Sequence, residues 1–365
     1  MIKKNKQVLV KPLWNNELGG KLFQLNYPGA FGRWRSIAAD LGISIGGWDM
    51  LPLEEADCVW FLDLPDTRKE FEQARQRVQK GVPFVLQVME TPTGRSQNFH
   101  TKNHALFDYV VTYQQGLPKS ENIFTYRLPN CFDRFRSDHK TFQERKCAVM
   151  VNSNRIEGWL ACRKAGVIGL PGIGPNLSGW HRPYWAWLVP ARGELYSWRR
   201  KFARLAADIA PNALDIYGPG WDGGKVSWNP FFDRKRYTNC VANGFTNQKL
   251  DVIANYRFTI SVENYRGNID YISEKMFEPL LVGSVPVYLG EEKIADIIPK
   301  SAYVDVRDFS NQTALLNYLQ HCPEEEWQRM YHAGQAFLFS KRAQEFSREE
   351  FVSKMIHILK TILKM

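Results

Sequence analysis

The segment Phe258–Gly290, FTISVENYRGNIDYISEKMFEPLLVGSVPVYLG, decides the fold. Phe258–Val262 is a short apolar run, which is typical of a buried strand, and polar residues follow it. Ser273–Val282 predicts a helix, and Val285–Leu289 predicts a second strand that ends at a glycine. Strand, helix and strand in this order form a βαβ unit of a parallel sheet.

The polar residues of this unit point to a phosphate-binding site. Ligands of open α/β sheets bind beyond the carboxyl ends of the strands, where Glu263 and Asn264 stand. The N-terminus of a helix favours phosphate, and Lys275 adds a full positive charge there. Glu274 can accept hydrogen bonds from sugar or ribose hydroxyls, and Tyr271 can pack against a base or a sugar ring. The alternative is that Glu274 and Lys275 are favourable surface charges in the first turn of a helix.

The same alternation of strands and helices extends over the rest of the chain. In the first half, strands are predicted at Cys58–Leu62, Pro83–Val88 and Tyr109–Thr112, and a charged helix at 67–80. In the second half, strands are predicted at Cys147–Asn152 and Leu214–Tyr217, with a helix at Leu195–Ala210 between them. This is an α/β pattern, and 365 residues suit two domains of average size.

We therefore expect two Rossmann-like domains that face each other across a cleft. Residues 1–140 would form the first domain, the polar stretch 130–146 the linker, and residues 146–340 the second domain. The segment 166–193, rich in Gly, Pro and Trp, predicts a long ordered loop.

The charge, the cysteine content and the apolar runs of the chain restrict the classes of function that it can have. The formal net charge is +10, which attracts polyanions, but no nucleic-acid-binding motif accompanies it, so no nucleic-acid partner is expected. The six cysteines are scattered without a CxxC pair, which favours reduced thiols. The first ten residues lack the apolar run of a signal peptide, and no stretch approaches the ~20 apolar residues that span a bilayer. A cytoplasmic protein is expected, with peripheral attachment to the inner face of the plasma membrane as a variant.

Residues 341–365 contain an amphipathic helix, predicted at 348–365. Phe351, Val352, Met355, Ile356, Leu359, Ile362 and Leu363 form an apolar stripe at helical spacing. Two interpretations stand: the helix packs back on the body of the protein, or it lies on an anionic membrane surface.

The 258–290 segment closely resembles the signature of the family GT10 α1,3/1,4-fucosyltransferases, in particular the soluble bacterial type. That pattern runs Phe-x-x-x-x-Glu-Asn, Asp-Tyr-x-Ser/Thr-Glu-Lys and Gly-x-Val-Pro-Val. Its elements here are Phe258, Glu263-Asn264, Asp270-Tyr271, Ser273-Glu274-Lys275 and 283–287. The loop between Asn264 and Tyr271 is one residue longer than the pattern. The resemblance implies a GT-B fold, with GDP-fucose bound by the second domain.

Upstream the resemblance is weaker. Leu214–Gly218 is similar to the family's strand-to-glycine turn, and Arg199 to its phosphate-binding arginine. A guanidinium can hold a diphosphate bidentately. Arg200 is adjacent, so the assignment can slip by one, and both can be plain surface arginines.

In the first half, Glu90-Thr91-Pro92 is similar to the family's Glu-Ser-Pro segment, whose glutamate is the general base. An inverting transferase needs a carboxylate to take the proton of the attacking hydroxyl. The alternative is that Glu90 merely caps a turn. Asp63 and Asp66, after the preceding strand, are the reserve candidates for the base.

No Asp-x-Asp motif follows a strand in the second half, so no protein-bound metal and no tightly bound cofactor are expected. Arg199, Lys275 and the helix N-terminus would neutralise the diphosphate instead. The resemblance implies that Mn²⁺ or Mg²⁺ stimulates turnover without such a site. His100 and His104 are interpreted as residues of an acceptor loop rather than metal ligands.

The sequence thus predicts transfer of fucose from GDP-fucose to a hydroxyl of an acceptor glycan, a surface polysaccharide or lipopolysaccharide precursor. Two rivals remain. One is a GT-B transferase for another nucleotide sugar, such as GDP- or ADP-heptose; the other is a non-catalytic glycan-binding protein of the same fold.

Overall fold

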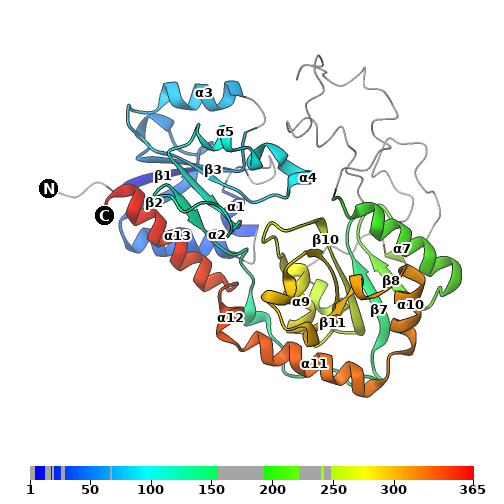
Figure 1. Ribbon diagram of the computed structural model, residues 1–365. Helices are drawn as coiled ribbons and strands as arrows, with labels where there is room; N and C mark the ends of the chain where they lie inside the picture. Colours follow the sequence, from blue (N-terminus) through cyan, green and yellow to red (C-terminus); the bar gives the residue numbers. More distant parts are fainter. Residues whose placement is uncertain are drawn as a thin grey trace, which may run out of the picture.

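Short apolar strands joined by helices build two parallel sheets in this computed structural model (Figure 1). The structure describes residues 5–12, 18, 20–25, 29–65, 68–154, 193–221, 240–241 and 248–365. Most of the predicted loop 166–193, and the reserve candidate Asp66, lie outside these residues.

The N-terminal sheet has the strand order β2-β1-β3-β4-β5-β6, and all its neighbours are parallel. Every residue of β3 and β4 is buried, as is usual for central strands covered on both faces. The helices α2 and α3 lie on opposite sides of this sheet in Figure 1. The strands are β1 (Lys6–Lys11), β2 (Ile43–Gly47), β3 (Cys58–Leu62), β4 (Phe84–Gln87), β5 (Tyr109–Thr112) and β6 (Ile123–Thr125); the helices are α1 (Leu22–Leu25), α2 (Ala30–Asp40), α3 (Arg68–Arg77), α4 (Pro92–Arg95) and α5 (Thr101–His104).

The C-terminal sheet has the order β12-β11-β10-β7-β8-β9 and is also parallel throughout. From the central pair β7 and β10, the chain adds β8 on one side and β11 on the other. The crevice for a ligand in such a sheet lies where the strand order reverses, here between the carboxyl ends of β7 and β10. The strands are β7 (Lys146–Val151), β8 (Leu214–Tyr217), β9 (Cys240–Val241), β10 (Tyr256–Gly267), β11 (Val285–Glu291) and β12 (Val304–Asp305); the helices are α7 (Tyr196–Ile209), α8 (Lys249–Ile253), α9 (Glu274–Leu281), α10 (Gln312–His321) and α11 (Glu324–Leu338).

The strands predicted at Tyr109–Thr112 and Leu214–Tyr217 are confirmed with the same bounds. The prediction for β10 was too short, because this strand continues from Val262 through the polar residues to Gly267. Its register against β11 shifts between Val262 and Gly267. The segment predicted as a loop after Asn264 therefore begins as strand.

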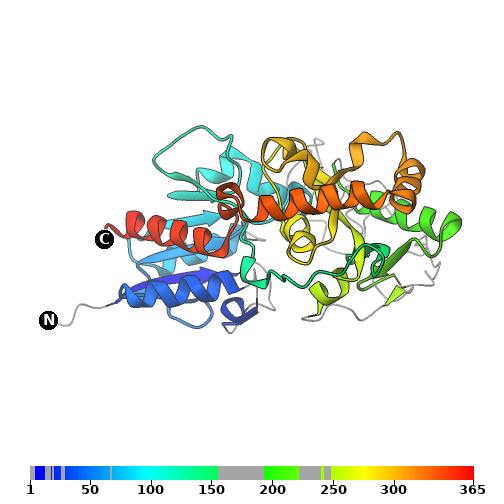
Figure 2. The same ribbon diagram turned by 90° about the horizontal axis from the view of Figure 1, so that it is seen from below.

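The last two helices, α12 (Lys341–Gln344) and α13 (Arg348–Leu363), return to the N-terminal sheet. Figure 2 shows α13 running beside α2. The Phe351 ring lies 5.9 Å from that of Phe31 and 5.6 Å from that of Tyr126. The apolar stripe of α13 is therefore buried in the N-terminal core. Among the helices of the described ranges, none combines the length and apolarity needed to cross a bilayer.

Candidate active site between the two sheets

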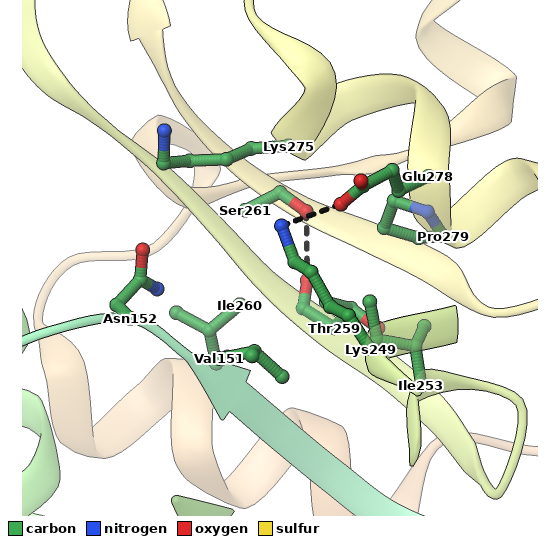
Figure 3. Close-up of a pocket in the computed structure, with 10 residues that line it drawn as sticks. All are labelled: Val151, Asn152, Lys249, Ile253, Thr259, Ile260, Ser261, Lys275, Glu278 and Pro279. Carbon is green, nitrogen blue, oxygen red and sulfur yellow. Dashed lines mark hydrogen bonds and ion pairs between the residues drawn. The ribbon is translucent and has the colours of Figure 1, made fainter. Parts of the chain in front are cut away.

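A pocket opens at the point of strand-order reversal in the C-terminal sheet (Figure 3). Lys275, at the start of α9, and Asn152, just after β7, lie on opposite sides of it. Lys249 of α8 extends toward Glu278 and pairs with it at 2.5 Å. The pocket thus combines two ammonium groups with carboxylate and amide acceptors.

The start of α9 is held in place by one buried carboxylate. Ser273 is the N-cap, and its Oγ accepts a hydrogen bond from the Lys275 N–H at 3.3 Å. Ser273 donates from its own N–H to Glu263 Oε1 at 2.8 Å and from Oγ to Oε2 at 2.7 Å. Glu263 is fully buried at the end of the apolar part of β10. It therefore orients the helix rather than presenting its carboxylate to a ligand.

Lys275 faces the same carboxylate. Its Nζ lies 3.5 Å from Glu263 Oε2 and 3.6 Å from Glu274 Oε1. Burial raises the pKa of Glu263, and the Lys275 ammonium opposes that rise. The ammonium is pinned at the helix N-terminus, where a phosphate would also be attracted.

Glu274, with 42% of its side chain exposed, is open to a ligand from the same turn. Burial acts against its ionisation, but Lys275 and Lys249 outweigh it and lower the pKa to about 2. Glu274 is thus a permanent hydrogen-bond acceptor near neutral pH. Lys249 and its partner Glu278 were missed by the sequence reasoning, because α8 lies upstream of the motif.

Arg199 reaches this cluster from α7. Its Nε donates to the Val262 carbonyl at 3.1 Å, and its Nη2 donates to Asn264 Oδ1 at 2.9 Å. The side chain is buried, and burial lowers the pKa of the guanidinium while Tyr196 and then Glu263 oppose this. Arg199, rather than the adjacent Arg200, therefore converges with Lys275 at the end of β10.

Gly218 stands just after β8, with a φ of 129° that favours glycine. The turn that it begins is tied to the loop after β7: Asn154 donates from N to the Pro219 carbonyl at 2.9 Å, and Trp221 Nε1 donates to the Asn152 carbonyl at 2.6 Å. Gly218 thus shapes the edge of the pocket on which Asn152 lies.

Glu90 lies at the equivalent edge of the N-terminal sheet. It follows β4 and is half-buried, and Asp63, which follows β3, is fully buried beside it. A Cβ placed on Gly94 of α4 would stand 2.8 Å from Glu90 Oε2, so the carboxylate lies directly over this glycine. Tyr113, just after β5, donates from its hydroxyl to the Glu90 carbonyl at 3.0 Å.

The two edges meet. The ring of Tyr113 packs edge-on against Tyr271 with centroids 5.3 Å apart, so Tyr271 helps to join the domains. Asp270 accepts hydrogen bonds from Gln115 N at 2.9 Å and from Arg127 Nη1 at 3.3 Å. Glu90 is thereby linked through Tyr113 to the loop that leads into α9.

The comparisons with known proteins agree with this geometry. Residues 229–360 match the family described as "Glycosyltransferase family 10 (fucosyltransferase) C-term". The match covers 132 of the 365 residues. The matched region contains the α9 cluster, whereas Arg199, Gly218 and Glu90 lie upstream of it.

Curated relatives match over part of the chain. The chain is 33% identical over 132 residues to alpha-(1,3)-fucosyltransferase B of Drosophila melanogaster, which covers 35% of this chain and 27% of that protein. It is 30% identical over 151 residues to alpha-(1,3)-fucosyltransferase 4 of Mus musculus; this match covers 40% of this chain and 30% of that protein. The chain thus spans less than a third of the length of each of these relatives.

Solved structures extend the likeness to the whole fold. An alpha1,3-fucosyltransferase matches with a TM-score of 0.53 at 16% identity, over 100% of this chain and 93% of that one. A DNA-modifying beta-glucosyltransferase matches with a TM-score of 0.54 at 10% identity, over 98% and 100%. The fold is GT-B: two parallel α/β domains whose carboxyl edges face each other.

Metal ligands do not gather in the part of the chain that the structure describes, where no group of three His, Cys, Asp or Glu side chains could hold an ion. His104 instead uses Nε2 in a hydrogen bond with the Asn98 carbonyl at 2.5 Å. Among the described residues, Arg199, Lys275 and Lys249 bring positive charge close to the start of α9.

Proposed function

We propose that this protein is an inverting fucosyltransferase that moves fucose from GDP-fucose to a hydroxyl of an acceptor glycan. The observation that carries the proposal is the convergence of Arg199 and Lys275 at the start of α9, inside a family 10 domain and opposite Glu90. The crystal structure of an alpha1,3-fucosyltransferase with GDP-fucose has the same fold, with a TM-score of 0.52.

In the proposed reaction the C-terminal domain binds the donor and the N-terminal domain binds the acceptor. Glu90 removes the proton of the acceptor hydroxyl while the hydroxyl oxygen attacks the anomeric carbon of fucose. The bond between fucose and GDP breaks on the opposite face of that carbon. Arg199 and Lys275 stabilise the negative charge that develops on the departing diphosphate. Glu274 accepts hydrogen bonds from donor hydroxyls. Stimulation by Mn²⁺ or Mg²⁺ stays a prediction of the family resemblance.

A surface polysaccharide or lipopolysaccharide precursor is the proposed acceptor, reached by a cytoplasmic enzyme. The formal net charge of +10 supports attraction to such anionic material or to the membrane that carries it. Because the stripe of α13 is buried, peripheral attachment would depend on charged surface residues.

The test is a panel of nucleotide sugars, each incubated with the protein and with glycan acceptors, with release of the free nucleotide as the readout. We expect release with GDP-fucose, and little with GDP-heptose, ADP-heptose or UDP-glucose. A preference for another donor would refute fucosyl transfer while keeping the fold. Failure of GDP, ADP and UDP alike to raise the melting temperature would favour a protein that does not bind nucleotide sugars.

A further inference from the structure

We propose that Asp63 is a positioning residue for Glu90, which holds the main chain of Glu90 in place and, through its own proton, tunes the strength of Glu90 as a base near neutral pH. The inference rests on the proposed function, since it concerns the residue that would deprotonate the acceptor.

Asp63, at the end of β3, is held by hydrogen bonds to the segment at the end of the neighbouring strand β4. Its N–H donates to the Gln87 carbonyl at 2.8 Å, and its Oδ1 accepts from the Met89 N–H at 2.7 Å. Both carboxylate oxygens face the Glu90 N–H, at 3.3 and 3.2 Å. The Asn98 amide donates to Oδ1 from the other side. One side chain therefore fixes the turn that presents Glu90.

The backbone of Asp63 supports a specific role. Its φ is 60°, in the left-handed region that costs an ordinary side chain of order 1 kcal/mol or more. The side chain is also buried to 1% exposure, an environment that penalises a carboxylate.

The groups that face Asp63 are mostly neutral or negative. Glu90 is the nearby negative charge and Arg95 the positive one, and the buried hydroxyls of Tyr113 and Tyr126 complete the surroundings. Burial, followed by the charge of Glu90, raises the pKa of Asp63 to about 7, against the hydrogen bonds of the Met89 and Glu90 N–H groups and against Arg95.

Two carboxyl groups that interact in this way titrate as a pair. As the pH rises through about 7, Asp63 loses its proton. Once Asp63 is also charged, its repulsion makes the Glu90 carboxylate hold a proton more strongly. A stronger base removes the acceptor proton more readily, so transfer should rise through this second ionisation.

The experiment is the pH profile of kcat/KM for GDP-fucose and acceptor, measured on the wild type, Asp63→Asn and, as a matched control, Asp305→Asn. Asp305 is a buried carboxylate paired with Arg307 on β12, at the edge of the C-terminal sheet, whereas Glu90 follows β4 of the N-terminal sheet. We expect the wild type and Asp305→Asn to show an inflection near pH 7 that Asp63→Asn loses. A purely structural role would lower the whole profile of Asp63→Asn without removing the inflection, and that result would overturn the proposal.

A second measurement covers the case in which Asp63→Asn does not fold. Difference infrared spectra of the wild type should show a protonated carboxyl group at pH 6 that disappears by pH 8, and in Glu90→Gln this loss should move to lower pH. No such band in the wild type would refute the tuning of Glu90 by Asp63. A wild type that transfers no fucose would instead refute the proposed function, so the two failures are distinguishable.

Discussion

Replacing Lys275 by methionine should impair the protein in two separable ways. Its Nζ lies 3.5 Å from Glu263 Oε2, and Glu263 is fully buried. At an effective dielectric constant of ~20, two charges at this distance attract by about 5 kcal/mol. Removal of one member of a buried pair commonly costs roughly 3–5 kcal/mol, because the other charge is left without a partner. We expect Lys275→Met to lower the free energy of unfolding by an amount at the lower end of this range, because burial already favours the protonated form of Glu263.

A double variant separates stability from donor binding. In Glu263→Gln/Lys275→Met both charges are gone, while the amide oxygen that replaces the carboxylate can still accept the hydrogen bond of the Ser273 N–H. We expect urea unfolding at pH 7 to recover most of the stability. GDP at 100 times its Kd should stabilise the wild type by about 2.7 kcal/mol. The double variant should gain much less at the same GDP concentration, because the cation that faces the diphosphate is missing.

Two results would refute this reasoning. If Lys275→Met unfolds at the same urea concentration as the wild type, the pair contributes nothing to stability. If the double variant binds GDP as tightly as the wild type, Lys275 is only a partner of Glu263, and the diphosphate is held elsewhere.

Three further predictions concern the opposite edge and the contact between the domains. Glu90→Gln should leave GDP binding unchanged and lower transfer at least ~100-fold, as measured by nucleotide release; unchanged turnover would remove Glu90 from the mechanism. Gly94→Ala places a methyl group 2.8 Å from the present position of Glu90 Oε2. It should therefore lower kcat with little change in melting temperature, and unaltered kinetics would show that the carboxylate position does not matter. Asp270→Ala removes the acceptor shared by Gln115 and Arg127 and should cost about 1–3 kcal/mol in urea unfolding, whereas Asp270→Asn, which can still accept from Gln115, should cost less.

Much of the C-terminal sheet could be predicted from the sequence because its signals are local. The βαβ unit around α9 has an apolar run, an N-cap serine and a second apolar run, and each feature acts within a few residues. The start of α13 at Arg348 was predicted for the same reason. Arg199 was named through its resemblance to the family's phosphate-binding arginine, and only the folded chain shows its side chain buried against the end of β10.

The other features of the fold and of the candidate site depend on contacts between segments that are distant in the sequence. The sequence does not reveal that Lys249 pairs with Glu278, because the two side chains meet only when α8 packs beside α9. Nor does it reveal that Tyr271 packs on Tyr113 across the domain boundary. Asp63 was a reserve candidate for the base, and only the folded chain shows its oxygens directed at the main chain of Glu90.

The position of α13 has a consequence for how the protein is made. Phe351, Val352, Met355 and Leu359 belong to the same buried cluster as strands β1, β3 and β4. A ribosome delivers those strands first and α13 hundreds of residues later, and domains generally fold as units when their chain has emerged. The N-terminal half must therefore keep an incomplete apolar face until α13 has emerged, while residues 146–338 can close their own core earlier. Chaperones that shield apolar surface would be needed chiefly by the half that is synthesised first.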